Sequence, residues 1–249
     1  MNKLPKLHLL NKSVKRDFHA EQGDNGEATI YIYDIIGEDF WTGEGVTAMK
    51  FVEALSKLKG VADTVHLRIN SPGGDVFEAR AITAAMLAFP GKFVAHIDGL
   101  AASAASYIAV RADEVEIAPG AFLMIHNGWT VAVGDRHTML ESAALLEKID
   151  ASIAADYVAK TGLDAAEVAA MMDAETWIDA ETAVSQKFAD RVAEKAEKVS
   201  NAWNLSAYAK APDIKVEREE SEHEEITAID PAIKARLYRE LQLMESELV

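Results

Sequence analysis

The chain has 249 residues, enough for one domain of ordinary size with a buried core and terminal extensions. Its 41 acidic and 25 basic side chains give a formal charge of −16, which argues against non-specific binding to nucleic acid. The absence of cysteine excludes disulfides, cysteine nucleophiles and thiolate zinc sites. No apolar run reaches the roughly 20 residues of a membrane span, and the N-terminus lacks the apolar core of a secretory signal, so we expect a cytoplasmic protein without a membrane partner.

Strand-type and helix-type segments alternate along the first half of the chain. Residues 1–26 are rich in lysine with little periodicity, and they predict an N-terminal arm or an edge element. After them the alternation predicts one α/β domain at residues 27–195, with a mostly parallel sheet and right-handed crossovers. Ligand sites in such a sheet lie outside the carboxyl ends of the strands. The expected strands lie at residues 28–36, 64–70 and 93–97, and the helices between them lie at residues 44–59 and 75–87.

A long helix dominates the second half. Two short strands, at residues 115–118 and 122–125, precede a helix expected at residues 135–160 whose apolar side chains step by three and four residues. At roughly 39 Å, it is longer than a small domain needs to cover its own sheet. It either projects toward another subunit or lies wholly on its own core. The remaining expected elements are a helix at 164–172, an extended segment at 175–178 and a helix at 179–187.

The composition shifts near the C-terminus. Residues 217–225 are a charge run that is typical of a solvated linker. Asp230 and Pro231 then form a good N-cap and first residue for a terminal amphipathic helix. We therefore interpret residues 196–249 as an acidic linker with a C-terminal helix, which docks either on its own body or on a partner.

Residues 99–106 read Gly-Leu-Ala-Ala-Ser-Ala-Ala-Ser and follow the expected strand at 93–97. The pattern predicts a strand that stops at Gly99, a turn through small residues, and a helix that begins at Ser103. A helix N-terminus offers unpaired N–H groups and the positive end of the helix dipole, where negative charge can develop on a substrate. Ser103 is therefore a candidate nucleophile, and the alternative is an ordinary N-cap serine.

Acyl transfer by serine needs a hydroxyl, a base within hydrogen-bond reach, an acid that orients the base, and donors for the oxyanion. The backbone N–H of Ala104 is one candidate donor. Residues 70–74, Asn-Ser-Pro-Gly-Gly, end an expected strand, and a glycine backbone tolerates the close approach of a substrate carbonyl. The Gly73-Gly74 pair is thus a second candidate donor, and the alternative is a tight turn without chemistry.

Among the seven histidines, His126 ends a buried strand next to a turn, where an imidazole can face a cleft. His126 is therefore the candidate base, with an ordinary surface histidine as the alternative. His66 and His96 lie inside strand-type runs and are expected to be packed. No pair of histidines has zinc-ligand spacing, and no phosphate-binding loop or dinucleotide fingerprint occurs, so we expect neither a metal nor a cofactor.

Three motifs carry a resemblance to a known family. They are residues 70–74, residues 99–103 and residues 124–127, the last reading Met-Ile-His-Asn. In this order and with these gaps, they resemble the motif set of the Clp protease proteolytic subunit. The resemblance covers residues 30–190. It implies a serine endopeptidase built on the spiral of βαβ units that this family shares with the crotonases.

The resemblance assigns roles to the candidate residues. Ser103 is the nucleophile, His126 is the general base, and the N–H groups of Gly74 and Ala104 form the oxyanion hole. The helix at 135–160 corresponds to the family's handle, which interdigitates two rings. The resemblance thus implies a heptameric ring or a stacked double ring that cleaves peptides.

The third member of the triad departs from the family pattern. The family usually has an aspartate two residues before an aromatic side chain. Here Glu175 stands two residues before Trp177. A glutamate orients a histidine as an aspartate does, although its longer arm needs a slightly retracted backbone. We favour Glu175 as the acid, with Asp173 as the competing candidate and a surface carboxylate as the alternative for either.

Further departures concern the biological role. The N-terminal region does not resemble the loops with which housekeeping members engage an ATPase of the AAA+ unfoldase class, and the acidic extension is foreign to them. Residues 75–77, residues 101–106 and residues 175–177 are similar to Clp-like proteases of phage and prophage head-assembly modules. This resemblance implies cleavage of scaffold or capsid precursors inside proheads. An unfoldase partner remains an option.

Two other functions are consistent with parts of the pattern. A crotonase-like acyl-CoA enzyme would share the spiral fold and use oxyanion holes without a serine–histidine pair. A non-catalytic assembly protein would retain the shell of a protease without serine reactivity. The coincidence of Ser103 with His126 favours the peptidase over both.

Overall fold

The computed structural model describes residues 3–38, 42–194 and 203–212. They belong to one compact unit, Met1–Pro212, and the predicted charge run and terminal helix lie outside the described residues. The helices are α1 (Lys3–Leu10), α2 (Ala48–Leu58), α3 (Val76–Ala88), α4 (Ala104–Val110), α5 (Arg136–Thr161), α6 (Ala165–Asp173) and α7 (Ala180–Ser185). The strands are β1 (Asp17–Gln22), β2 (Glu27–Tyr33), β3 (Thr64–Ser71), β4 (Lys92–Ala102), β5 (Glu114–Ile117), β6 (Phe122–Ile125), β7 (Thr176–Asp179) and β8 (Arg191–Val192).

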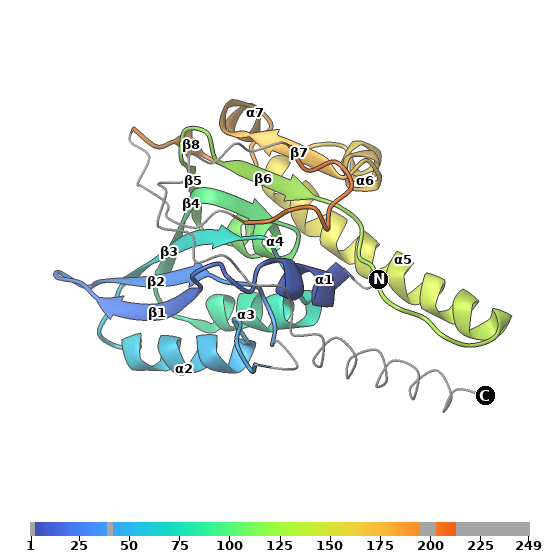
Figure 1. Cartoon of the computed structure of the whole chain (residues 1–249). Coiled ribbons are helices and arrows are strands. Elements are labelled where there is room, and N and C mark those ends of the chain that lie inside the picture. The colour runs from blue at the N-terminus through green and yellow to red at the C-terminus, as the bar shows by residue number, and fades with distance from the viewer. Residues whose placement is uncertain (1–2, 39–41, 195–202, 213–249) are drawn as a thin grey trace, which may run out of the picture. The chain divides into compact units, whose positions relative to one another are not determined.

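One sheet joins all eight of these strands (Figure 1). Its main path runs β1-β2-β3-β4-β5-β8. Strand β6 pairs with the C-terminal end of β4 and, on its other side, with β7. Neighbours along the path are parallel except for β1 and β2, and the β6–β7 pair is antiparallel. The predicted α/β class with a mostly parallel sheet is therefore confirmed.

Alternating side chains decide which face of the sheet is covered. Along β2, Ala28, Ile30 and Ile32 are buried and the intervening residues are partly exposed. The same periodicity of two places the inward residues of the parallel strands in one large apolar core beneath α2, α3 and α4. The amphipathic helix α2, for example, begins at the N-cap Thr47 and buries Phe51 against this core.

The sheet has a second apolar face at the C-terminal end of β4, beside β6. Leu100 and Ala102 of β4 point away from the main core, whereas Ala101 between them points into it. The outward pair joins Met124 of β6 and Leu7 of α1 in a smaller cluster. The sheet is therefore covered on both faces where β4, β6 and β7 meet.

The course of β4 differs from the prediction. The strand does not stop at Gly99 but continues to Ala102, and α4 begins at Ala104. The reason is long-range pairing, because β6 runs parallel to the last three residues of β4, with Ala102 opposite Met124. The turn is thereby reduced to Ser103 alone.

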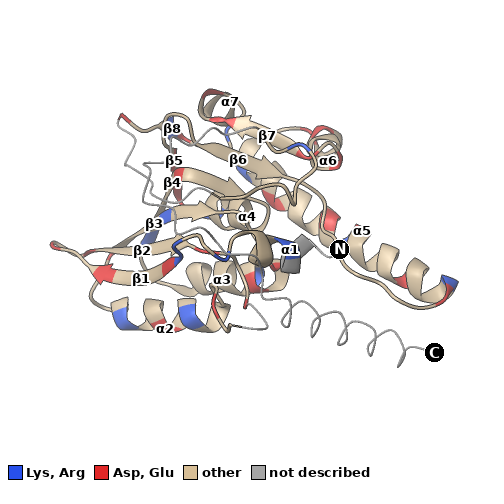
Figure 2. Cartoon of the chain, viewed as in Figure 1, with Lys and Arg blue, Asp and Glu red and all other residues tan. Residues whose placement is uncertain are grey.

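The buried side chains of helix α5 lie toward its C-terminal end. Its buried residues are Ile153, Tyr157 and Thr161, all in its last third. Figure 1 shows the first part of α5 extending away from the sheet, and Figure 2 shows that its tip begins with a basic residue, Arg136. Apolar side chains on this part, including Leu140 and Leu145, are more than half exposed.

No helix in the described ranges combines the length and the apolar character that crossing a membrane requires. Charges of both signs are interspersed over the ribbon (Figure 2), as on α2, where Glu53 lies between Lys50 and Lys57.

Candidate active site

Ser103 occupies the single-residue turn between β4 and α4. Its backbone has φ 54° and ψ −122°, a region that L residues rarely adopt and that costs of order 1–3 kcal/mol. The turn is held by its own backbone, since the Ser103 N–H donates to the carbonyl of Met124 at 2.9 Å and its carbonyl accepts the Ser106 hydroxyl at 2.7 Å. The Ser103 side chain makes no cap hydrogen bond to α4, so it is not an ordinary N-cap.

His126 lies beside Ser103 because of the pairing between β4 and β6. Ala102 is opposite Met124, so the residues just beyond both strand ends come together at one edge of the sheet. The Nε2 atom of His126 is 2.8 Å from the Oγ atom of Ser103, a hydrogen-bond distance. This is the contact that a serine nucleophile and its base require before reaction.

The glycine pair after β3 presses directly against this turn. Gly73 has φ +90°, and a Cβ atom there would lie 2.5 Å from the carbonyl oxygen of Ala102 and 2.7 Å from Cβ of Ser103. Gly74 has φ +153°, and a Cβ atom there would lie 1.8 Å from the carbonyl oxygen of Ile36. Both positions therefore require glycine, and Gly73 packs directly against the Ser103 turn.

Two backbone donors remain available at this point. No hydrogen bond within the described residues engages the N–H of Gly74 or of Ala104. Ala104 is the first residue of α4, where an N–H has no partner inside its own helix. Both residues line the same cavity as Ser103.

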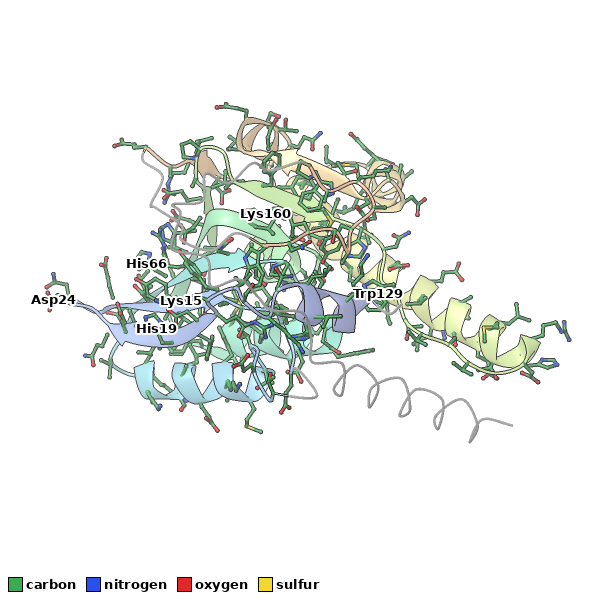
Figure 3. The ribbon with its side chains drawn as sticks, viewed as in Figure 1. Lys15, His19, Asp24, His66, Trp129 and Lys160 are labelled. Atoms are coloured by element: carbon green, nitrogen blue, oxygen red, sulfur yellow. The ribbon has the colours of Figure 1, made fainter. Side chains whose placement is uncertain are left out.

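A cavity of about 290 Å³ opens beside Ser103 and His126. Its wall includes Phe77, residues 126–131 after β6, and side chains of α5 between residues 145 and 153. Figure 3 labels Trp129, one of these residues, beside α5. The apolar members of the lining include Val76, Tyr107, Leu146, Ile149 and Ile153.

The candidate acids lie at the next strand. β7 pairs antiparallel with β6, and the pairing ends with Ile125 opposite Thr176. His126 directly follows Ile125, and Glu175 directly precedes Thr176. Glu175 is buried at 9% exposure and has a positive φ of 50°. Asp173 instead accepts a hydrogen bond of 2.6 Å from the side-chain amide of Asn127.

The protein-family comparison bears on this geometry. A family model described as Clp protease matches residues 27–196, more than half of the chain. The chain belongs to the Clp protease family. The match includes Ser103, His126 and both candidate acids, and it supports a peptidase. It ends before the described segment at residues 203–212.

Two other histidines of this Clp protease, His66 and His96, interact with each other across neighbouring strands β3 and β4. The Nδ1 atom of His66 lies 2.9 Å from Nε2 of His96, and Nδ1 of His96 lies 3.2 Å from a carboxylate oxygen of Glu116. Burial lowers the pKa of His96, and its hydrogen bond to the Glu116 carboxylate opposes that effect. Figure 3 labels His66 on β3. Among the described residues, no three His, Asp or Glu side chains form a group suited to a metal ion.

The structure adds residues to the site that sequence reasoning missed. Asp150 of α5 accepts the N–H of Gly128 at 2.6 Å and so ties the segment after His126 to the long helix. Burial raises the pKa of Asp150, and the charge of Asp173 adds to the effect.

Trp203 and Tyr208 reach the glycine loop from the C-terminal side. The signal for this pair was two aromatic side chains just before the charge run, a composition that a solvated linker lacks.

Proposed function

We propose that this member of the Clp protease family is a serine endopeptidase with Ser103 as nucleophile and His126 as general base. One observation carries the proposal, the 2.8 Å contact between Nε2 of His126 and Oγ of Ser103 on a strained single-residue turn. Such strain is typical of functional positions.

The reaction follows from these groups. His126 takes the Ser103 proton as Oγ forms a bond to the scissile carbonyl carbon. The resulting oxyanion accepts hydrogen bonds from the N–H groups of Gly74 and Ala104. The tetrahedral intermediate collapses, the C–N bond breaks, and His126 gives the proton to the leaving amine. Water, deprotonated by His126, then attacks the acyl-enzyme and releases the new carboxylate and Ser103.

We assign the orienting acid to Glu175 in preference to Asp173. His126 and Glu175 are the next residues beyond the Ile125–Thr176 pair that ends the β6–β7 pairing, whereas the Asp173 side chain is bonded to Asn127. A buried carboxylate in this position holds the imidazole in the productive tautomer and stabilises the imidazolium that forms during attack.

The substrate is proposed to be a polypeptide with an apolar side chain next to the scissile bond. The cavity beside Ser103 is lined by apolar side chains of α5, among them Leu146, Ile149 and Ile153. A volume of about 290 Å³ accommodates one large aliphatic or aromatic side chain.

We further propose that the chain assembles into a heptameric ring or a stacked pair of rings. The exposed apolar side chains on the outer part of α5, with Leu140 at 58% and Leu145 at 53% exposure, support a contact between copies. Native mass spectrometry tests this point directly. A monomer at micromolar concentration would overturn it.

The finer biological proposal is processing of phage scaffold or capsid proteins during prohead maturation. It rests on the similarity of residues 75–77, 101–106 and 175–177 to phage-encoded relatives. Incubation with a capsid precursor, with and without an AAA+ unfoldase and ATP, tests it. Defined cleavage without the unfoldase supports the proposal, and cleavage only of unfoldase-delivered substrates contradicts it.

The catalytic proposal is tested by hydrolysis of a fluorogenic peptide with a leucine next to the scissile bond. We expect Ser103→Ala and His126→Ala each to lower kcat by at least about 10³-fold. Ser56→Ala and His19→Ala replace the same residue types on α2 and β1, outside the lining of the cavity, and serve as matched controls. Equal turnover by all four variants would overturn the assignment.

A further inference from the structure

The segment at residues 203–212, which we call the strap, packs on the second face of the sheet. Leu205, Ala207 and Tyr208 are buried in the smaller apolar cluster with Met124 and Leu100. Figure 1 shows the strap in orange beside β6 and β7. Because His126 and Ser103 follow the same strands, the strap reaches the catalytic pair from the side opposite the main core.

Two strap side chains hold the loop that carries the glycine pair. The Nε1–H of Trp203 donates to the carbonyl of Asn70 at 3.1 Å, and the hydroxyl of Tyr208 donates to the carbonyl of Pro72. Pro72 directly precedes Gly73, which presses against the Ser103 turn. The position of the candidate oxyanion donor Gly74 is therefore linked to the strap through two hydrogen bonds.

The Tyr208 ring also touches the candidate base. Its centroid lies 5.5 Å from that of His126 with an interplanar angle of 79°, an edge-to-face contact. On its other side it makes a similar contact of 5.9 Å with Trp177. Burial raises the pKa of Tyr208, and its hydrogen bond with the Ser103 side chain opposes this effect, so the phenol stays neutral.

The two residues after Tyr208 hold the candidate acid. The backbone N–H groups of Ala209 and Lys210 donate to the Glu175 carboxylate at 3.2 and 2.7 Å. The Lys210 ammonium donates to the carbonyl of Ala174 at 2.5 Å. These hydrogen bonds fix the side chain of a residue whose backbone φ is positive.

We propose that Tyr208 is a positioning residue for the peptidase reaction, because it holds the glycine loop through Pro72 and buttresses the His126 ring while the adjoining amides hold Glu175. The proposal rests on the function proposed above and extends it. It assigns part of the catalytic arrangement to a segment beyond residues 27–196, the region that the family match covers.

The test compares Tyr208→Phe with the wild type in the full-length protein. Phenylalanine keeps the buried ring and removes the hydroxyl, which donates to the carbonyl of Pro72 and interacts with the Ser103 side chain. Tyr33→Phe is the control, since it also removes a tyrosine hydroxyl from a hydrogen bond, the partly buried one from Tyr33 to Asp98 at 2.6 Å. Each protein is titrated with a fluorophosphonate, and both the rate constant and the final labelled fraction are measured, together with kcat and KM for the fluorogenic peptide.

We expect Tyr208→Phe to be labelled to completion but roughly fivefold to tenfold more slowly, with a matching fall in kcat and KM within about twofold. Tyr33→Phe should label within about twofold of the wild-type rate. A wild-type rate in Tyr208→Phe would overturn the proposal. A reduced labelled fraction at an unchanged rate constant would also overturn it, because that result describes a loss of folded protein. Failure of the wild type to label would instead reject the peptidase function itself.

Discussion

Gly73 is the glycine at which an added side chain would collide with the Ser103 turn. An alanine Cβ there would lie 2.5 Å from the Ala102 carbonyl oxygen and 2.7 Å from Ser103 Cβ. These separations are roughly 1 Å shorter than ordinary van der Waals contact. The backbone of Gly73 also has φ +90°, which disfavours any side chain. Gly73→Ala therefore combines backbone strain with a collision against the nucleophile turn.

Gly120 separates these two effects. Its φ of +80° is similar, but a Cβ atom there meets nothing within 4 Å. Gly120→Ala should cost about 1–2 kcal/mol of unfolding free energy from the backbone alone. Gly73→Ala should cost this amount plus about 1–3 kcal/mol for overpacking. Because the collision shifts the Ser103 turn, the labelling rate should also fall about 10²-fold.

The assay is urea denaturation of both variants, followed by fluorophosphonate labelling under conditions where each is folded. We expect Gly120→Ala to label at the wild-type rate despite its lower stability. If Gly73→Ala matched Gly120→Ala in both stability and labelling rate, the close packing between the glycine loop and Ser103 would be refuted.

Three further predictions concern acids and a buried hydroxyl pair. Glu175→Gln should lower kcat by about 10²-fold or more, and Asp173→Asn by much less; the reverse order in peptide hydrolysis would move the acid to Asp173. Burial raises the pKa of Asp34 to about 6. The folded protein therefore binds the Asp34 proton more tightly than the unfolded chain does, and the free energy of unfolding falls as pH rises toward 6. Asp34→Asn should remove a fall of about 1–3 kcal/mol between pH 4 and 7 in urea titrations, and an unchanged pH profile would contradict this. Tyr157→Phe removes the 2.8 Å hydrogen bond to Ser106 and should cost about 1 kcal/mol, measured in the same way, whereas no loss would show that the bond adds nothing.

The sequence predicts the parts of the site that depend on local pattern. Alternation of strands and helices gives the parallel sheet, and the end of each strand predicts where the loops at residues 70–74 and 99–103 lie. The sheet and the positions of these loops follow from short-range periodicity and breakers, which a single sequence displays. The structure also brings Ser103 and His126 together at hydrogen-bond distance, which the resemblance to the Clp proteolytic subunit implies.

The features that sequence analysis missed depend on long-range contacts. Gly99 reads as a strand end, yet β4 continues past it because β6 supplies a partner for residues 100–102. The aromatic residues Trp203 and Tyr208 lie close to a charged region, and their burial depends on a second apolar face created by β4, β6 and α1. The helix α1 and the two-residue strand β8 likewise have too little pattern of their own to be predicted.

The most direct test of the central claim is intact-mass analysis of the assembled protein after treatment with a fluorophosphonate, with peptide mapping of the adduct. The account predicts one adduct per chain, on Ser103, that is absent in Ser103→Ala and strongly reduced in His126→Ala. No adduct on the wild type, or an adduct on another residue, would contradict the claim that Ser103 and His126 form an activated nucleophile.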